Sequence, residues 1–351
     1  MTIVTVGPSC INEHLLAQMK GSGASCFRIN LSHSNQDSLK TYWDLLNRVN
    51  IIPSIDTQGA QVRLFSKENN LNFSKGEKAR IFFKRRTFDS MNDKSLFCTT
   101  EILLHQLKHG DCLRCDFGSL VFSILAVDFQ EKSLTLETVN SGSFTSNRAI
   151  DCIGSKLKLP SLTEFDKDSI LFGIKKGLDT IFHSFTSSEL DILEIRKIAP
   201  ENRIIAKIES RPGLENLKSI VQVADGILID RGDLSRDISI GLIPYAVEKI
   251  LDECLLQNKP CYVATNVLDS MMHESLPSRA EISDMWNLLS KGVAGFVLAA
   301  EAAIGDHPLE SVQVCTHMQR LYNLSSQGFI SLIDTNLLNI DMSDDTLKNW
   351  L

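Results

Sequence analysis

Residues 203–235 read RIIAKIESRPGLENLKSIVQVADGILIDRGDLS, and this stretch decides the fold. Its two short apolar runs, residues 203–208 and 226–229, lack the alternation of half-exposed strands and are typical of strands covered on both faces. Residues 213–223, between the runs, have the apolar spacing of a helix. Polar residues follow each apolar run at once. The stretch therefore predicts a strand, a helix and a second parallel strand, with chemistry at the strand ends.

The same unit recurs along most of the chain. Strands are predicted at residues 3–6, 25–29, 51–55, 180–182, 203–208, 226–229, 261–264 and 295–298. Helices are predicted at residues 12–20, 36–48, 166–176, 188–198, 213–223, 244–257, 279–289 and 309–324. Eight alternating units favour a closed (β/α)8 barrel of the α/β class. An open doubly wound sheet is the alternative, but no G-x-G-x-x-G motif follows the first strand.

The alternation is interrupted once, after the third strand. From about residue 63 to about residue 159, short strands and turn signals replace helical spacing. We therefore expect a discontinuous barrel domain and a small β-rich insert. The predicted boundaries are 1–63 and 160–327 for the barrel, 64–159 for the insert and 328–351 for a C-terminal tail.

Composition excludes several classes of protein. The 351 residues carry a formal net charge of -7, which argues against the clustered basic surface of a nucleic-acid-binding protein. No apolar run reaches the length of about 18 residues needed to span a membrane. The nine widely spread cysteines fit reduced thiols, and the Cys112/Cys115 pair is a coincidence of spacing. With no secretory signal at the N-terminus, we expect a cytoplasmic protein without nucleic-acid or membrane partners.

Polar residues at the predicted strand ends indicate a metal site. The C-terminal ends of barrel strands form the active site in such folds, and a buried polar side chain is costly unless it is paired. Glu209 and Asp233 follow neighbouring strands, and two carboxylates there suit Mg²⁺ or Mn²⁺. The alternative is that both acids are ion-paired with Lys207 or Arg231.

Cations and small residues near the same ends fit transfer of a charged group. Lys207 is placed to neutralise charge on such a group, and Arg28 with Arg63 is placed to clamp phosphate oxygens. Surface salt bridges are the alternative for both arginines. Thr265 offers a hydroxyl for proton delivery through water, unless it is only a satisfied strand-end threonine. Gly232 permits close approach of backbone N–H groups to an anion.

With these residues in view, the sequence resembles the pyruvate kinase family over nearly its whole length. The resemblance is carried, in the family's order, by TIVTVGPSC (2–10), RINLSHS (28–34), DTQGAQVR (56–63), KLPSLTEFDKD (158–168), IIAKIESRPGLEN (204–216), ILIDRGDLS (227–235), CYVATNVLDSMM (261–272), PSRAEISDMWN (277–287) and LAAEAAIGDHPLESV (298–312). It implies a barrel with a mobile lid, Mg²⁺ or Mn²⁺, K⁺ and ADP or ATP. The implied reaction moves a phosphoryl group between phosphoenolpyruvate, or a close analogue, and ADP or another acceptor through a Mg-bound enolpyruvate.

The resemblance also implies roles for individual positions. The implied catalytic residues are Lys207, Thr265 and Arg28. The implied divalent-metal ligands are Glu209 and Asp233. The implied substrate contacts are Arg63, Gly232, Asp233 and Ser184. The K⁺ site falls on Asn30, Ser32, Asp56 and Thr57, and the nucleotide contacts on Pro8, Asn30, His33 and Arg148.

Several positions depart from the family's pattern. Asp230 stands where a small apolar residue is usual. Further departures are Ser34, Gln61, Asn147-Arg148, Asn266 and residues 299–302. The family's C-terminal domain is also missing from the sequence, which leaves a homodimer through the barrel as the expected assembly.

Two other functions therefore stay open. One is a divalent-metal-dependent enolate enzyme, an aldolase, lyase or other transferase with a changed substrate. The other is a non-catalytic descendant that binds a ligand or partner.

Overall fold

The computed structural model of the chain describes residues 1–59, 61–90, 94–115, 120–153 and 157–325. The chain divides into two compact units, Met1–Gly59 with Ser161–Leu351, and Ala60–Pro160. The boundaries predicted from sequence lie within four residues of these limits, at 63/64 and 159/160. The predicted tail at 328–351 falls outside the described residues.

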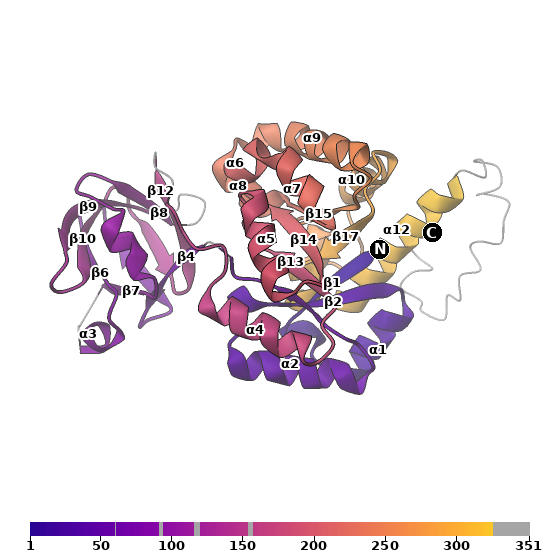
Figure 1. Ribbon diagram of the computed structural model, residues 1–351, viewed down its shortest axis with the longest axis horizontal. Helices are drawn as coiled ribbons and strands as arrows, with labels where there is room; N and C mark the ends of the chain where they lie inside the picture. Colours follow the sequence, from indigo (N-terminus) through magenta and orange to yellow (C-terminus); the bar gives the residue numbers. More distant parts are fainter. Residues whose placement is uncertain (60, 91–93, 116–119, 154–156, 326–351) are drawn as a thin grey trace. The chain divides into compact units, whose positions relative to one another are not determined.

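The first unit is a closed barrel of eight parallel strands, as predicted (Figure 1). Its strands are β1 (Thr2–Val6), β2 (Ala24–Asn30), β3 (Ser54–Asp56), β13 (Thr180–His183), β14 (Arg203–Ile208), β15 (Gly226–Asp230), β16 (Cys261–Ala264) and β17 (Gly295–Leu298). They pair in this order around the barrel, and β17 closes on β1. The carboxyl ends of all eight strands therefore lie at one rim of the barrel, where the sequence places its polar residues.

Helices surround the barrel strands. The main ones are α1 (Glu13–Gly21), α2 (Gln36–Arg48), α4 (Glu164–Ile174), α5 (Glu189–Ile198), α7 (Leu217–Val223), α9 (Ile243–Leu256), α10 (Arg279–Ser290) and α12 (Pro308–Ser325). Shorter helices are α6 (Arg211–Glu215), α8 (Arg231–Asp237) and α11 (Ala300–Ala303). Capping boxes at Asn35, Thr163 and Ser278 fix the starts of α2, α4 and α10 by satisfying backbone N–H groups.

Two predicted elements are wrong in detail. The third strand is Ser54–Asp56 and not residues 51–55. Pro53 has no N–H for a sheet ladder, so pairing with β2 begins only at Ser54. The helix predicted at residues 213–223 is two helices, α6 and α7, which meet at Asn216.

Apolar side chains fill the barrel and the layer around it. Inside lie Ile3, Phe182, Ile205, Leu228, Tyr262, Ala264 and Val297, all at most 4% exposed. Alternate strand positions such as Val4, Ile204 and Ile227 pack outward against the helices. Strands covered on both faces explain why the sequence shows continuous apolar runs instead of alternation.

The second unit is the β-rich insert that the sequence predicts. Seven strands close into a small barrel, in the order β10 (Ser133–Thr138), β6 (Lys78–Phe82), β7 (Ser95–Cys98), β4 (Val62–Ser66), β12 (Arg148–Ile153), β8 (Cys112–Cys115) and β9 (Leu120–Asp128). The strands β5 (Asn70–Phe73) and β11 (Gly142–Thr145) form a separate pair, and α3 (Arg85–Ser90) follows β6. A core that includes Leu64, Ile81, Leu113 and Phe122 fills this barrel.

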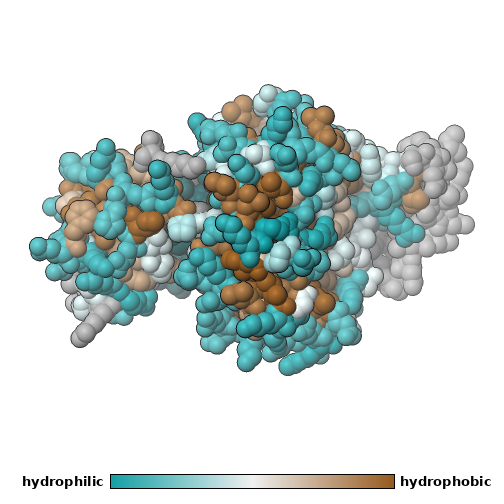
Figure 2. Space-filling view, viewed as in Figure 1, coloured by the Kyte–Doolittle hydropathy of each residue, from teal (hydrophilic) through white to brown (hydrophobic). Residues whose placement is uncertain are grey.

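Hydrophobic side chains also gather on the barrel unit's surface over α4 and α5 (Figure 2). Leu171 and Ile174 on α4, with Leu190 and Leu193 on α5, are exposed. The homodimer expected from the sequence stays a prediction that light scattering can test.

No helix in the described ranges is long and apolar enough to cross a bilayer.

Candidate active site

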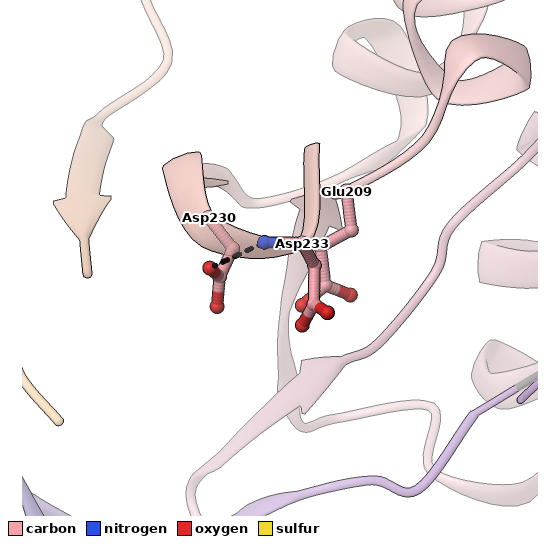
Figure 3. A group of neighbouring side chains, drawn as sticks. All are labelled: Glu209, Asp230 and Asp233. Carbon is pink, nitrogen blue, oxygen red and sulfur yellow. Dashed lines mark hydrogen bonds between the residues drawn. The ribbon is translucent and has the colours of Figure 1, made fainter. Parts of the chain in front are cut away.

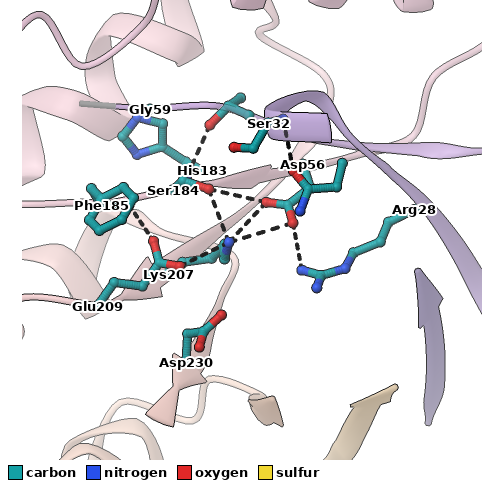
Figure 4. Close-up of polar contacts among 12 residues, drawn as sticks. Arg28, Ser32, Asp56, Gly59, His183, Ser184, Phe185, Lys207, Glu209 and Asp230 are labelled. Atoms are coloured by element: carbon teal, nitrogen blue, oxygen red, sulfur yellow. Dashed lines mark hydrogen bonds and ion pairs between the residues drawn. The ribbon is translucent and has the colours of Figure 1, made fainter. Parts of the chain in front are cut away.

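Lys207 is the centre of a buried ionic cluster at the C-terminal rim of the barrel (Figure 4). It lies near the end of β14, and its side chain is 6% exposed. Its Nζ lies 3.1 Å from Asp56 Oδ1 and 2.9 Å from Glu209 Oε1, and it donates to Ser184 Oγ at 3.0 Å. Because every contact holds it from a different strand end, the ammonium is fixed in position.

Asp56 links this ammonium to a second buried cation. Its Oδ2 lies 2.7 Å from Arg28 Nη1, and neither side chain is more than 3% exposed. Arg28 also donates from Nε to Thr5 Oγ1 at 2.9 Å and lies over the ring of Phe182. Arg28 is therefore not the surface salt bridge that the sequence left open.

Three carboxylates meet next to Lys207. Glu209 follows β14, Asp230 ends β15 and Asp233 lies in the first turn of α8. One oxygen from each lies within 4.8 Å of the others (Figure 3). Glu209 also accepts a hydrogen bond from Phe185 N at 2.5 Å, and Asp233 pairs with Arg236 at 3.1 Å.

Burial and like charge shift the pKa values of these acids. Burial, with the charges of Asp233 and Asp230, raises the pKa of Glu209 to about 8 despite the attraction of Lys207. Burial and Asp230 also raise the pKa of Asp233. Burial lowers the pKa of Lys207, but the charges of Asp56 and Glu209 outweigh it and raise that pKa overall. The Lys207 ammonium therefore stays charged, whereas Glu209 and Asp233 have too little positive charge around them to keep their usual pKa values.

The donor set therefore fits a hard divalent cation. Carboxylate oxygens are the ligands that Mg²⁺ and Mn²⁺ prefer, and a dication would offset the burial and the repulsion that raise these pKa values. The ion-pair alternative for Glu209 is also present, through Lys207, and the two are compatible because a carboxylate offers about four lone-pair sites.

Thr265 contacts one of these three carboxylates. Its hydroxyl donates to Asp230 Oδ1 at 2.6 Å, and its backbone adopts a φ of 70°, which is rare for a β-branched residue. Arg231 donates to the carbonyl oxygens of Thr265 and Asn266 at 2.9 to 3.1 Å and so holds this strained turn. A Cβ on Gly232 would lie 2.7 Å from Thr265 Cγ2, so the position requires glycine.

Comparisons with known proteins show the family to which this chain belongs. The family model "Pyruvate kinase, barrel domain" matches residues 1–312. The chain belongs to the pyruvate kinase family. Pyruvate kinases of Sporosarcina psychrophila and of Lactobacillus delbrueckii subsp. bulgaricus are 31% and 30% identical to it over 323 residues. These alignments cover 89% of this chain but 55% and 54% of the two relatives, so the chain spans about half of their length.

A solved structure shows the same relationship. The crystal structure of Cryptosporidium parvum pyruvate kinase superposes with a TM-score of 0.83 at 26% identity. The superposition covers 92% of this chain and 70% of that one. The family resemblance in the sequence is therefore confirmed.

The positions that the pyruvate kinase resemblance assigns to K⁺ are in contact with protein groups here. Asn30 accepts from Ser32 N at 2.9 Å and so caps the turn after β2. Thr57 Oγ1 accepts from Ser184 N at 3.0 Å, and Asp56 is shared by Arg28 and Lys207. These contacts leave K⁺ binding as a prediction.

The remaining predicted residues divide between the units. Pro8 and His33 are exposed in short turns after β1 and β2. Ser184 joins the Lys207 cluster directly. Arg63 and Arg148 belong to the second unit, on β4 and β12, and Arg63 donates to Asn147 O at 2.9 Å. Phosphate and nucleotide contacts by these two arginines stay predictions.

The roles of some residues at the site were not predicted from the sequence. The sequence indicated Arg231 only as an ion-pair partner of the acids, but its guanidinium donates to the Thr265 turn and pairs with Asp284 at 2.6 Å. Phe185, with a φ of 54°, directs its N–H to Glu209. Glu301, polar at a strand end, accepts from Leu268 N and Ala299 N and is structural. Arg231, between the two acids of DRGD (230–233), and Glu301, polar at a strand end, carried a signal in the sequence.

Replacing Gly59 by alanine should destabilise the rim beside Ser184. Gly59 has a φ of 67°, and an added Cβ would lie 2.4 Å from Ser184 O. Backbone strain and overpacking together should cost about 3 kcal/mol of unfolding free energy, measured by urea denaturation. Gly177→Ala is the matched control, because its φ is 86° and its nearest atom lies 4.0 Å away. Its cost should be about 1 kcal/mol; equal costs for the two variants would refute the steric argument.

Acid should destabilise the protein through His183. This histidine is fully buried, with Nδ1 2.8 Å from Thr186 Oγ1 and Nε2 3.1 Å from Ser161 O, and burial lowers its pKa. Below about pH 6.5 the unfolded chain binds the proton that the folded chain excludes, so this group's contribution falls as pH falls.

The test compares wild type with His183→Gln by urea unfolding at about pH 7 and about pH 5.5. Wild type should lose about 1 kcal/mol more than the variant over this interval, since one pH unit is worth at most about 1.4 kcal/mol per group. Parallel losses in the two proteins would contradict the assignment.

Proposed function

We propose that this chain moves a phosphoryl group between phosphoenolpyruvate, or a close analogue, and ADP or another acceptor. The observation that carries the proposal is the fixed ammonium of Lys207 beside the carboxylates of Glu209 and Asp233. Phosphoryl transfer requires positioning and charge neutralisation more than covalent participation. Membership of the pyruvate kinase family supports the same reaction.

Each residue has a physical task in this proposal. Glu209 and Asp233 would hold Mg²⁺ or Mn²⁺, which supplies Lewis-acid polarisation of substrate oxygens when it is bound. Lys207 stabilises negative charge on the phosphoryl group during transfer, and Arg28 adds positive charge beside it. The Thr265 hydroxyl would pass a proton through water to the carbon of the enolate.

The binding residues follow from the same proposal. Gly232, Asp233 and Ser184 would line the substrate site together with Arg63. Pro8, Asn30, His33 and Arg148 would contact the nucleotide, and Asn30, Ser32, Asp56 and Thr57 would hold K⁺.

The test is pyruvate formation from phosphoenolpyruvate, ADP and Mg²⁺ by the full chain, followed with a coupled assay. We expect turnover that requires the divalent cation and disappears in Asp233→Asn. Absence of turnover with ADP and with other nucleoside diphosphates would overturn the nucleotide as acceptor.

A second function is favoured by the hydrogen bond between Thr265 and Asp230. A hydroxyl already paired with a carboxylate is suited to proton transfer at an enolate carbon without phosphoryl transfer. Such an enzyme would exchange the methyl protons of pyruvate with D₂O in the presence of metal and without nucleotide. Exchange without any phosphoryl transfer would favour this enolate enzyme over the first proposal.

A further inference from the structure

The two carboxylate oxygens of Asp230 differ in their hydrogen bonds. The residue is 9% exposed at the end of β15. Its Oδ1 accepts from Thr265 Oγ1 at 2.6 Å and from Asp233 N at 3.4 Å. Within the described ranges, no hydrogen bond reaches its Oδ2. Capping α8 and holding Thr265 need only one neutral acceptor, so neither task explains a second oxygen and a full charge.

That charge lies against two other acids. A third like charge within 4.8 Å of Glu209 and Asp233 raises the energy of the ionised cluster. The nearby cations form their ion pairs with other acids. Lys207 pairs with Asp56 and Glu209, and Arg236 pairs with Asp233. An uncompensated charge at such a buried place is costly unless a further cation joins it.

The spacing of the three acids suits that cation. Ligand oxygens lie about 2.1 Å from Mg²⁺ in near-octahedral geometry, so two oxygens on one ion are about 3 to 4 Å apart. One oxygen from each of Glu209, Asp230 and Asp233 lies within 4.8 Å of the others, which is close to that spacing.

We propose that Asp230 is a third carboxylate ligand of the divalent cation, so that this chain binds the metal before any substrate arrives. The inference rests on the proposed function for the other two ligands, Glu209 and Asp233. Three carboxylates neutralise a dication more completely than two, which increases affinity for the free metal ion. They also leave less positive charge to attract an anionic substrate.

The experiment titrates Mn²⁺ into the full chain without substrate or nucleotide and measures free Mn²⁺ by electron paramagnetic resonance. Asp230→Asn keeps the shape of the side chain and its ability to cap α8, but removes one charged ligand. Asp252→Asn is the matched control, because it removes the same charge from an exposed pair with Lys249 on α9. Glu209→Gln removes one of the two other proposed carboxylate ligands and so tests whether Mn²⁺ binds at this site. Thermal unfolding without metal checks that each variant is folded.

We expect Asp230→Asn to weaken Mn²⁺ binding by about tenfold or more and Asp252→Asn to leave it unchanged. Unchanged affinity in Asp230→Asn, with loss in Glu209→Gln, would overturn the role of Asp230 and leave the two-acid site standing. Failure of wild type to bind Mn²⁺ would instead overturn the proposed function. Asp230→Ser, which also caps a helix, replaces Asp230→Asn should the latter not fold, and the same tenfold criterion applies.

Discussion

Lys207→Met should lower phosphoryl transfer by about a thousandfold or more. The variant removes the only side-chain ammonium that contacts both Asp56 and Glu209 in the part of the chain that the structure describes. A cation that stabilises transferring phosphoryl charge is worth about 10³ to 10⁵ in rate in comparable sites. The measurement is kcat for pyruvate formation from phosphoenolpyruvate and ADP.

Two readouts separate this role from a merely structural one. Lys207→Met should still bind Mn²⁺, because removing the ammonium takes away a competitor for Glu209. Lys291→Met, on the surface in an exposed pair with Glu248, should retain wild-type kcat. Full activity in a folded Lys207→Met protein would exclude the assigned role.

Asp56→Ala should cost about 3 to 5 kcal/mol of unfolding free energy. The change takes from the buried Arg28 the carboxylate that lies 2.7 Å from it. It also removes one of the two carboxylates that contact Lys207, at 3.1 Å, and leaves Lys207 paired with Glu209 alone. Removing one partner of a buried ion pair is strongly destabilising, because the remaining charge is uncompensated. Urea denaturation of the full chain without metal or ligand measures the cost.

An exposed acid provides the control. Asp44 pairs with Lys176 at 3.1 Å but is 44% exposed, and a surface pair contributes at most about 1 kcal/mol. Asp44→Ala should therefore change stability little. Similar costs for Asp56→Ala and Asp44→Ala would show that the buried cluster does not hold the rim together.

The sequence predicts the barrel well because its signal is local. Apolar runs such as residues 203–208 and 261–264 coincide with β14 and β16, since strands buried on both faces must be apolar throughout. The third strand was misplaced because Pro53 acts through the sheet ladder, which depends on its neighbour β2.

The sequence predicts individual residues of the site but not the contacts between them. Lys207 and Glu209 lie at the end of the same predicted strand, and the barrel brings Asp233 close to Glu209. The pairing of Thr265 with Asp230 joins residues 35 positions apart and depends on a left-handed turn. The backbone N–H of Phe185 has no side-chain signal at all. Such contacts arise from tertiary packing, which no local pattern encodes.

Anomalous diffraction from crystals of the full chain grown with Mn²⁺ tests the proposed metal site directly. We expect one strong anomalous peak at the C-terminal rim of the barrel, within bonding distance of carboxylate oxygens of both Glu209 and Asp233. A Mn²⁺ ion bound elsewhere, with these two acids still paired only to Lys207 and Arg236, would contradict the proposed site.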